Sequence, residues 1–256
     1  MAIPIDLSGR VALVTGGTKG IGLGITRALL EAGATVATCA RSDAEPLSGT
    51  THHLCDVRDP EAVSALVEEV VAAHGRLDIA VNNAGGAPYA PAADASPRLH
   101  EKVVGLNLMA PLNVAQAANR VMQRQQHGGS IVNISSVSAL RPSPGTAAYG
   151  AAKAGVDSLT RSLAVEWAPR VRVNAIDVGL CRTELTDDHY GGDAGVAAIE
   201  RTIPLRRMAE PAEVGRVVAF LACDLASYVS GATVACHGGG EPPVFLYAQQ
   251  IPAPTP

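Results

Sequence analysis

The chain has 256 residues, 47% of them hydrophobic and 17% charged, so it can bury a core without disulfides or a metal. Its formal net charge is −4 and no basic run stands out, which argues against a nucleic acid partner. No apolar stretch approaches the length of a membrane span, and the first residues do not resemble a signal peptide. The five cysteines include no CxxC pair and the seven histidines no HExxH motif. We therefore expect reduced thiols, a cytoplasmic location and no metal site.

Short β-branched runs alternate with longer helical runs along the chain. The expected strands are Arg10–Thr15, Thr35–Ala40, a short strand at Leu54, Leu77–Asn82, Ser130–Ser135, Val171–Ile176 and Ala232–Cys236. The expected helices are Ile21–Ala32, Pro60–His74, long stretches around 98–126 and 147–168, and Pro211–Cys223. This alternation predicts an α/β fold in which a doubly wound parallel sheet carries helices on both faces.

Three segments fall outside that alternation. Arg41–Thr51 is too short and polar for a full crossover helix, so we expect none there. The segment 182–210 contains several glycines and is predicted to form a mobile lid over the substrate. Residues 241–256 hold five of the 17 prolines and are predicted to be an extended tail after a single domain, 1–240.

A glycine-rich loop, Thr15 to Gly22 (TGGTKGIG), follows the first strand and opens the first helix. At this point of a parallel sheet, the helix N-terminus offers unpaired N–H groups to the pyrophosphate of a dinucleotide. Gly16, Gly20 and Gly22 let the backbone turn tightly and approach the ligand. The spacing is GxxxGxG rather than GxGxxG, and a glycine-rich turn without a ligand remains the alternative.

The end of the second strand bears on the choice of cofactor. An acidic residue there favours NAD, and a nearby arginine favours NADP. Here Ala40 occupies the acidic position, Arg41 follows, and Lys19 lies in the glycine loop. We therefore expect NADP(H) to be favoured, with NAD(H) possible because Asp43 lies close by.

Tyr149 and Lys153 are four residues apart in an expected helix and so share one face. A phenol has a pKa near 10, and a neighbouring cation favours the phenolate, which would make the tyrosine a usable acid and base. The spacing alone is weak, because it occurs by chance in many surface helices. Ser136 ends a strand 13 residues before Tyr149, at the sheet edge where ligands bind. Asn107 lies within a helical stretch that does not favour asparagine.

Together these motifs resemble the short-chain dehydrogenase/reductase family in order and spacing, over about residues 8–240. They are the glycine loop, Asp56, Asn82–Gly85, Asn107, Ser136, Tyr149 and Lys153. The resemblance implies a single-domain Rossmann fold with a seven-stranded parallel sheet. It also implies an NAD(P)(H)-dependent oxidoreductase that transfers hydride between the cofactor and a carbonyl or secondary alcohol.

The resemblance also implies a role for each matched residue. Tyr149 would be the catalytic acid and base, and Lys153 would bind the nicotinamide ribose and lower the pKa of the tyrosine. Ser136 would orient the substrate carbonyl, and Asn107 would hold a water that relays protons to Lys153. Residues implied to bind the cofactor are Gly16, Thr18, Lys19, Gly20, Ile21, Gly22, Arg41, Asp56, Val57, Asn83, Ala84, Gly85, Tyr149, Lys153, Gly179, Cys181 and Thr183.

The sequence departs from the family pattern at Val178-Gly179, where Pro-Gly is usual, and at His237-Gly238-Gly239, where Asp-Gly-Gly is usual. The overall spacing resembles 3-oxoacyl-thioester reductases most. A steroid, a sugar or another small secondary alcohol is the alternative substrate. A non-catalytic nucleotide-binding scaffold or sensor is the alternative class. The resemblance further implies a homotetramer that packs through the helix around 147–168 and the last strand.

Overall fold

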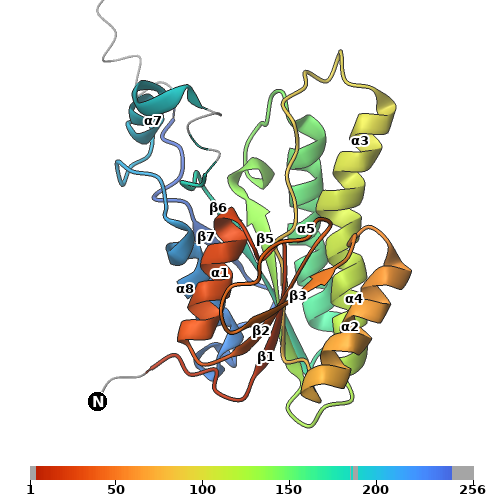
Figure 1. The fold of residues 1–256 in the computed structure, drawn as a ribbon. Coiled ribbons are helices and arrows are strands. Elements are labelled where there is room, and N and C mark those ends of the chain that lie inside the picture. Colours follow the sequence, from red (N-terminus) through yellow and green to blue (C-terminus); the bar gives the residue numbers. More distant parts are fainter. Residues whose placement is uncertain (1–3, 185, 187–189, 244–256) are drawn as a thin grey trace, which may run out of the picture.

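The structure is a computed structural model that describes residues 4–184, 186 and 190–243. Seven parallel strands form one sheet, as predicted, and their order in the sheet is β3-β2-β1-β4-β5-β6-β7 (Figure 1). The strands are β1 (Val11–Thr15), β2 (Thr35–Ala40), β3 (Thr50–Leu54), β4 (Ile79–Asn82), β5 (Gly129–Ser136), β6 (Val171–Val178) and β7 (Thr233–Cys236). The strand order reverses between β1 and β4, and ligands of such sheets bind at this point.

The helices cover both faces of the sheet (Figure 1). They are α1 (Gly20–Glu31), α2 (Pro60–His74), α3 (Pro97–Val104), α4 (Ala110–Met122), α5 (Ala147–Glu166), α7 (Gly192–Glu200) and α8 (Pro211–Ala222), with short turns Val137–Ala139 and Asp224–Ala226. Successive residues of β1 point to opposite faces: Leu13 packs in the core under α2, α4 and α5, and Val14 packs in the core under α1 and α8. The β-branched strands therefore form the middle of three layers.

Two glycines let α1 and α8 pack at close range. A Cβ at Gly24 would overlap the backbone of Pro211, and a Cβ at Gly215 would lie 2.5 Å from the carbonyl oxygen of Gly24. Because this contact joins the start of α8 to the first turns of α1, it holds the N-terminus of α1 in place beside the sheet edge.

The prediction of one long helical stretch around 98–126 is wrong in one respect, because the stretch is interrupted. A π-helical turn, η1 (Gly105–Met109), separates α3 from α4 and contains Asn107. Pro111 lacks the N–H that an α-helix would offer to the carbonyl of Asn107, which favours the wider turn. Elsewhere the boundaries agree closely. Asp59 caps α2 by accepting hydrogen bonds from two backbone N–H groups, and no helix forms over Arg41–Gly49, as expected.

Candidate active site

A cavity of about 620 Å³ opens at the carboxyl ends of β1, β4, β5 and β6. It brings together most of the residues expected to bind cofactor or substrate: Gly16, Lys19, Gly20, Ile21, Gly22, Asn83, Ala84, Gly85, Ser136, Tyr149, Lys153, Gly179 and Thr183. Six other expected residues, Thr18, Arg41, Asp56, Val57, Asn107 and Cys181, do not line it. The glycine loop and the tyrosine–lysine helix thus face one space from opposite sides.

The glycine loop has the geometry that its sequence requires. Gly16 and Gly20 have φ values of +63° and +49°, in the left-handed region that favours glycine. A Cβ at Gly22 would overlap the carbonyl of Gly16. The loop therefore passes tightly into α1 and leaves the first N–H groups of that helix facing the cavity.

A carboxylate already lies on this helix N-terminus. The backbone N–H of Gly20 donates to Oε1 of Glu184 at 3.0 Å, and Glu184 belongs to the segment expected to form the lid. An N–H group at a helix N-terminus binds phosphate as readily as carboxylate, so this donor fits an anionic cofactor. Glu184 was not among the predicted site residues, because nothing in the local sequence around it indicates a contact with a residue 164 positions earlier.

Asn83 and Thr15 join the end of β4 to the glycine loop. Oγ1 of Thr15 accepts from the backbone N–H groups of Asn83 and Ala84, each at 3.0 Å. Nδ2 of Asn83 donates to the carbonyls of Thr15 at 2.9 Å and Gly16 at 3.1 Å. The side chain of Asn83 therefore positions the loop that would hold the cofactor.

Asn107 is fully buried and holds the chain after Asn83 from the other side. Its Oδ1 accepts from the N–H of Gly86 at 2.8 Å, and its Nδ2 donates to the carbonyls of Gly86 and Val103, each at 2.9 Å. A Cβ at Gly85 would lie 2.8 Å from Oδ1 of Asn107 and 3.4 Å from Nζ of Lys153. The absence of a side chain at Gly85 thus leaves room for both Asn107 and Lys153 beside its backbone.

Ser136, Tyr149 and Lys153 meet as the spacing predicted. Ser136 ends β5, and the tyrosine and lysine lie on one face at the start of α5. The hydroxyl of Ser136 accepts from the backbone N–H of Ser138 at 3.1 Å, and Ser136 acts to lower the pKa of Tyr149. Nζ of Lys153 donates to the carbonyl of Ile134 at 2.7 Å and lies 5.6 Å from the centre of the Tyr149 ring. A carbonyl group in the cavity can therefore meet two hydroxyl groups at once.

The pKa of Tyr149 was expected to be lowered, but the protein without a bound cofactor does not lower it. Burial raises the pKa of Tyr149, and only Ser136 opposes it. Burial also lowers the pKa of Lys153 to about 8, although the nearby Asp157 opposes that change. The physical reason is desolvation, which disfavours the charged form of both groups. Tyr149 is therefore a neutral proton donor near pH 7.

Three of the residues that do not line the cavity lie past the ends of β2 and β3. Arg41 is exposed just after β2, and the adjacent Asp56 accepts from the backbone N–H and Nε of Arg58 at 3.1 and 2.9 Å. These bonds with Arg58, together with the charge of Arg41, hold the pKa of Asp56 below its usual value. Val57 is buried in the core.

Cys181 follows the end of β6 and pairs with Ala209 in an isolated β-bridge. Burial raises the pKa of its thiol to about 12, so the thiol is not ionised near neutral pH. Its contribution to any cofactor contact would therefore be that of a small neutral group.

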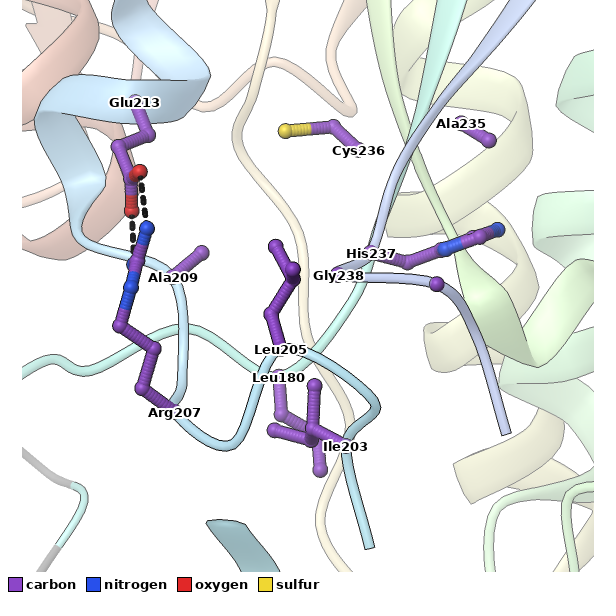
Figure 2. Close-up of a pocket in the computed structure, with 11 residues that line it drawn as sticks. Leu180, Ile203, Leu205, Arg207, Ala209, Glu213, Ala235, Cys236, His237 and Gly238 are labelled. Atoms are coloured by element: carbon purple, nitrogen blue, oxygen red, sulfur yellow. Dashed lines mark hydrogen bonds and ion pairs between the residues drawn. The ribbon is translucent and has the colours of Figure 1, made fainter. Parts of the chain in front are cut away.

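A second cavity, of about 250 Å³, lies between the end of the lid segment, the start of α8 and the end of β7 (Figure 2). Its walls are largely apolar, with Leu180, Ile203 and Leu205 among them. The ion pair between Arg207 and Glu213 forms its polar side, with N–O distances of 2.6 and 2.7 Å. The ring of His237 points away from this pair, on the far side of its own backbone (Figure 2).

Neither a membrane span nor a metal cluster is found in the part of the chain that the structure describes. None of its helices combines the length and hydrophobicity needed to cross a bilayer. No group of three or more histidine, cysteine or acidic side chains is arranged there to hold a metal ion.

The comparisons with known proteins agree with this geometry. The sequence profile of a family described as Enoyl-(Acyl carrier protein) reductase matches residues 16–241. The human protein named Dehydrogenase/reductase SDR family member 4 is 35% identical over 249 residues, which cover 92% of this chain and 88% of the relative. The 3-oxoacyl-(acyl-carrier-protein) reductase FabG of Thermotoga maritima is 37% identical over 244 residues, covering 91% of this chain and 98% of the relative.

A solved structure shows the same similarity in three dimensions. The ligand-free aldohexose dehydrogenase of Thermoplasma acidophilum superposes with a TM-score of 0.87 at 29% identity, covering 98% of each chain. The enzymes of this family act on small carbonyl or alcohol substrates with NAD(P)(H). The chain belongs to the short-chain dehydrogenase/reductase family and is an NAD(P)-dependent oxidoreductase.

Proposed function

We propose that the protein interconverts a 3-oxoacyl thioester and the corresponding 3-hydroxyacyl thioester with NADP(H). The observation that carries the catalytic part is that Ser136, Tyr149 and Lys153 line the same cavity as the glycine loop. When bound there, the reduced nicotinamide supplies a hydride. The similarity to the Thermotoga reductase over 98% of that protein supports the thioester as substrate class.

The three side chains divide the work on the carbonyl group. The hydroxyl groups of Ser136 and Tyr149, which line the same cavity, hold the carbonyl oxygen and orient the carbonyl carbon toward the nicotinamide. As that carbon gains the hydride, its oxygen takes the proton of Tyr149, so the products are the alcohol and the oxidised cofactor. Lys153 then stabilises the tyrosinate until it regains a proton, through a water held near Asn107.

The preference for NADP(H) rests on the end of β2. Arg41 is exposed there, and Ala40 takes the place where an NAD-binding carboxylate is expected. The carboxylate of Asp43 accepts from the adjacent N–H of Ala44 at 3.0 Å and so has a local partner. Arg41, with Lys19 in the glycine loop, would bind the 2′-phosphate. Thr18, Ile21, Asp56, Val57, Gly179, Cys181 and Thr183 would complete the cofactor site.

The remaining parts of the proposal concern the rest of the chain. Domain 1–240 would hold both sites, its segment 182–210 would close over the substrate, and the proline-rich tail 241–256 would follow the domain. Residues 1–3, 185, 187–189 and 244–256 of these segments lie outside the described residues. The described part of the segment carries α7, which the sequence analysis did not foresee. A cytoplasmic location and a homotetramer belong to the same proposal.

Turnover of a defined panel tests this function. Acetoacetyl-CoA, a 3-oxosteroid, an aldohexose and a small ketone would be offered with NADPH, and the matching alcohols with NADP⁺, following the absorbance of the reduced cofactor. We expect the thioester to have the highest kcat/KM. A faster steroid or sugar would replace the substrate class and leave the reaction type intact. Binding of NADPH without turnover of any compound would instead favour a scaffold or sensor.

A further inference from the structure

Tyr89, in the loop between β4 and α3, has no part in the reaction described so far. Its side chain is 77% exposed, yet it is held against a second loop. A Cβ on Gly145 would overlap Cε2 of the tyrosine ring and would lie 2.5 Å from Cδ2. Gly145 also has a φ of +77°, which favours glycine. One side of the ring therefore rests on Gly145, and most of the remainder is open to solvent.

The backbone fixes Tyr89 between the catalytic cavity and the helix that carries Tyr149. The N–H of Ala90 donates to the carbonyl of Gly145 at 2.8 Å, and Gly145 precedes Tyr149 by four residues. Gly86 lines the catalytic cavity, and its N–H and carbonyl are both held by hydrogen bonds. Tyr89 follows Gly86 by three residues, a length of chain that spans at most about 10 Å. The tyrosine ring thus lies near the opening of the cavity.

The two loops on this side of the cavity carry almost no charge. We call them the rim loops: residues 86–93, after β4, and residues 137–146, after β5. The first has no charged side chain, and the second has only that of Arg141. Nε of Arg141 donates to Oε1 of Glu241 at 2.6 Å, so this charge is paired. The rim loops therefore offer no unpaired charge to a ligand.

The side chains that are most exposed in the rim loops are all apolar or aromatic. Leu140, four residues after Ser136, is 62% exposed, and Tyr89 is more exposed still. The hydroxyl groups of Ser143 and Thr146 are hydrogen-bonded to each other at 2.7 Å. Apolar surface left uncovered beside a cavity is typical of ligand-binding grooves. The glycine loop faces the cavity from the opposite side, so this surface is available to the substrate rather than to the cofactor.

We propose that Tyr89 and Leu140 bind the hydrocarbon chain of the substrate and make the enzyme selective for carbonyl compounds with longer chains. The inference rests on the proposed function only in that the reacting carbonyl lies at Ser136 and Tyr149, and it does not require a thioester. A chain that leaves this carbonyl along Gly86 meets the ring of Tyr89. Each CH₂ group removed from water adds about fourfold to the affinity, so a chain that reaches the ring binds better than a short one. Tyr89 is thus a specificity-determining residue and takes no part in proton or hydride transfer.

Substrates that differ only in chain length test this role. Acetoacetyl-CoA and 3-oxooctanoyl-CoA would be compared with NADPH, and 2-butanone with 2-octanone as a pair that lacks the thioester. We expect the wild type to have the higher kcat/KM for the longer member of each pair that it reduces. Tyr89→Ala should lower kcat/KM about 10-fold for the longer member, mainly through KM, and leave the shorter within about twofold. Tyr89→Phe should keep the wild-type values, because the ring is retained.

Leu54→Ala is a matched control. Leu54 is 66% exposed, but it ends β3 at the outer edge of the sheet, away from the rim loops. Its removal should leave the ratio between long and short substrates unchanged, and every variant should bind NADPH as the wild type does. An equal loss for both chain lengths in Tyr89→Ala, or an unchanged ratio, would overturn the inference. A loss confined to an aldohexose would also overturn it, because the ring would then stack on a sugar.

Equilibrium binding separates this inference from the proposed function. Alcohols cannot be oxidised by a protein that holds NADPH, so the affinities of 2-octanol and 2-butanol can be measured by calorimetry without turnover. We expect the wild type to bind 2-octanol more tightly than 2-butanol, and Tyr89→Ala to weaken 2-octanol by about 10-fold. Equal affinities in the wild type, or no binding of either alcohol, would overturn the inference. Tighter binding of 2-octanol by a protein that reduces no thioester would instead count against the proposed substrate class and leave the hydrocarbon site in place.

Discussion

The backbone N–H of Gly20, at the start of α1, donates a hydrogen bond of 3.0 Å to the side chain of Glu184. The two residues are 164 positions apart, and Glu184 also lines the cavity where the cofactor is expected. A carboxylate and a phosphate compete for the same donor, because both are anions drawn to a helix N-terminus. Binding of a dinucleotide would thus displace Glu184 and the segment that carries it.

Replacing Glu184 should strengthen cofactor binding. Glu184→Gln removes a negative charge from the pyrophosphate site and weakens the internal competitor while keeping the size of the side chain. We expect NADPH to bind about 3- to 10-fold more tightly, equivalent to about 0.7–1.4 kcal/mol. Fluorescence titration would measure this, with Asp193→Asn in α7 as a control for charge loss from the same segment. Unchanged or weaker binding by Glu184→Gln would show that the carboxylate does not compete.

Tyr149→Phe should abolish turnover and leave cofactor binding nearly intact. The change removes the proton donor from the cavity that Tyr149 lines, and adds no bulk. Loss of general acid catalysis costs on the order of 10²–10⁴ in kcat. Steady-state rates and NADPH titration on the same preparation would check both halves. A variant that kept more than about a tenth of the wild-type kcat would rule out this role for Tyr149.

Arg41→Ala should weaken the use of NADPH and leave NADH nearly unaffected. A guanidinium can form two charge-assisted bonds with a phosphate, and each is worth roughly 1.5–3 kcal/mol. We therefore expect kcat/KM for NADPH to fall by about 10- to 150-fold. Adding Ala40→Asp should then favour NADH, because a carboxylate binds the ribose hydroxyls and repels the phosphate. A wild type that prefers NADH would show that Arg41 points to solvent.

The protein is expected to be a tetramer in solution. Val165, near the end of α5, is 80% exposed, and Phe220 and Tyr228, before β7, are also exposed. Large apolar side chains exposed in a single subunit are often covered at interfaces between subunits. Light scattering should give four times the chain mass of 26.2 kDa at micromolar concentration. Val165→Glu should reduce the mass to that of a dimer, and a wild-type monomer would refute the expectation.

Asp157 should make stability depend on pH in a direction unusual for a carboxyl group. Its pKa is raised in the folded protein, from 3.8 to about 6, so the folded state binds the proton more tightly than the unfolded state. The free energy of unfolding therefore falls as pH rises from about 4 to about 6, and Asp157→Asn avoids that loss. Relative to wild type, the variant should gain up to about 3 kcal/mol across this window. Urea titrations at several pH values would measure the difference, which should stay flat for Glu166→Gln.

Much of the fold could be read from local pattern, because its causes are local. β-branched runs such as Val11–Thr15 form strands, and Asp59, Pro60 and Gly75 define the ends of α2 through their own backbone preferences. Alternation of strands and helices then leaves few topologies other than a doubly wound parallel sheet. The π turn at Gly105–Met109 was missed, because a proline near the start of a helix is also compatible with an unbroken one.

The sequence by itself determined the reaction class, since Ser136, Tyr149 and Lys153 lie at a strand end and on one helical face whatever the distant contacts are. Only the tertiary structure decided what surrounds them. Glu184 contacts Gly20 from a distant segment, and the buried carboxyl groups of Asp157 and Asp177, the second of which raises the pKa of the first, come from separate elements. Their effects depend on burial, which sets how strongly charges interact and cannot be read from spacing along the chain. For the same reason the pKa of Tyr149, expected to be lowered by Lys153, is raised by the protein around it.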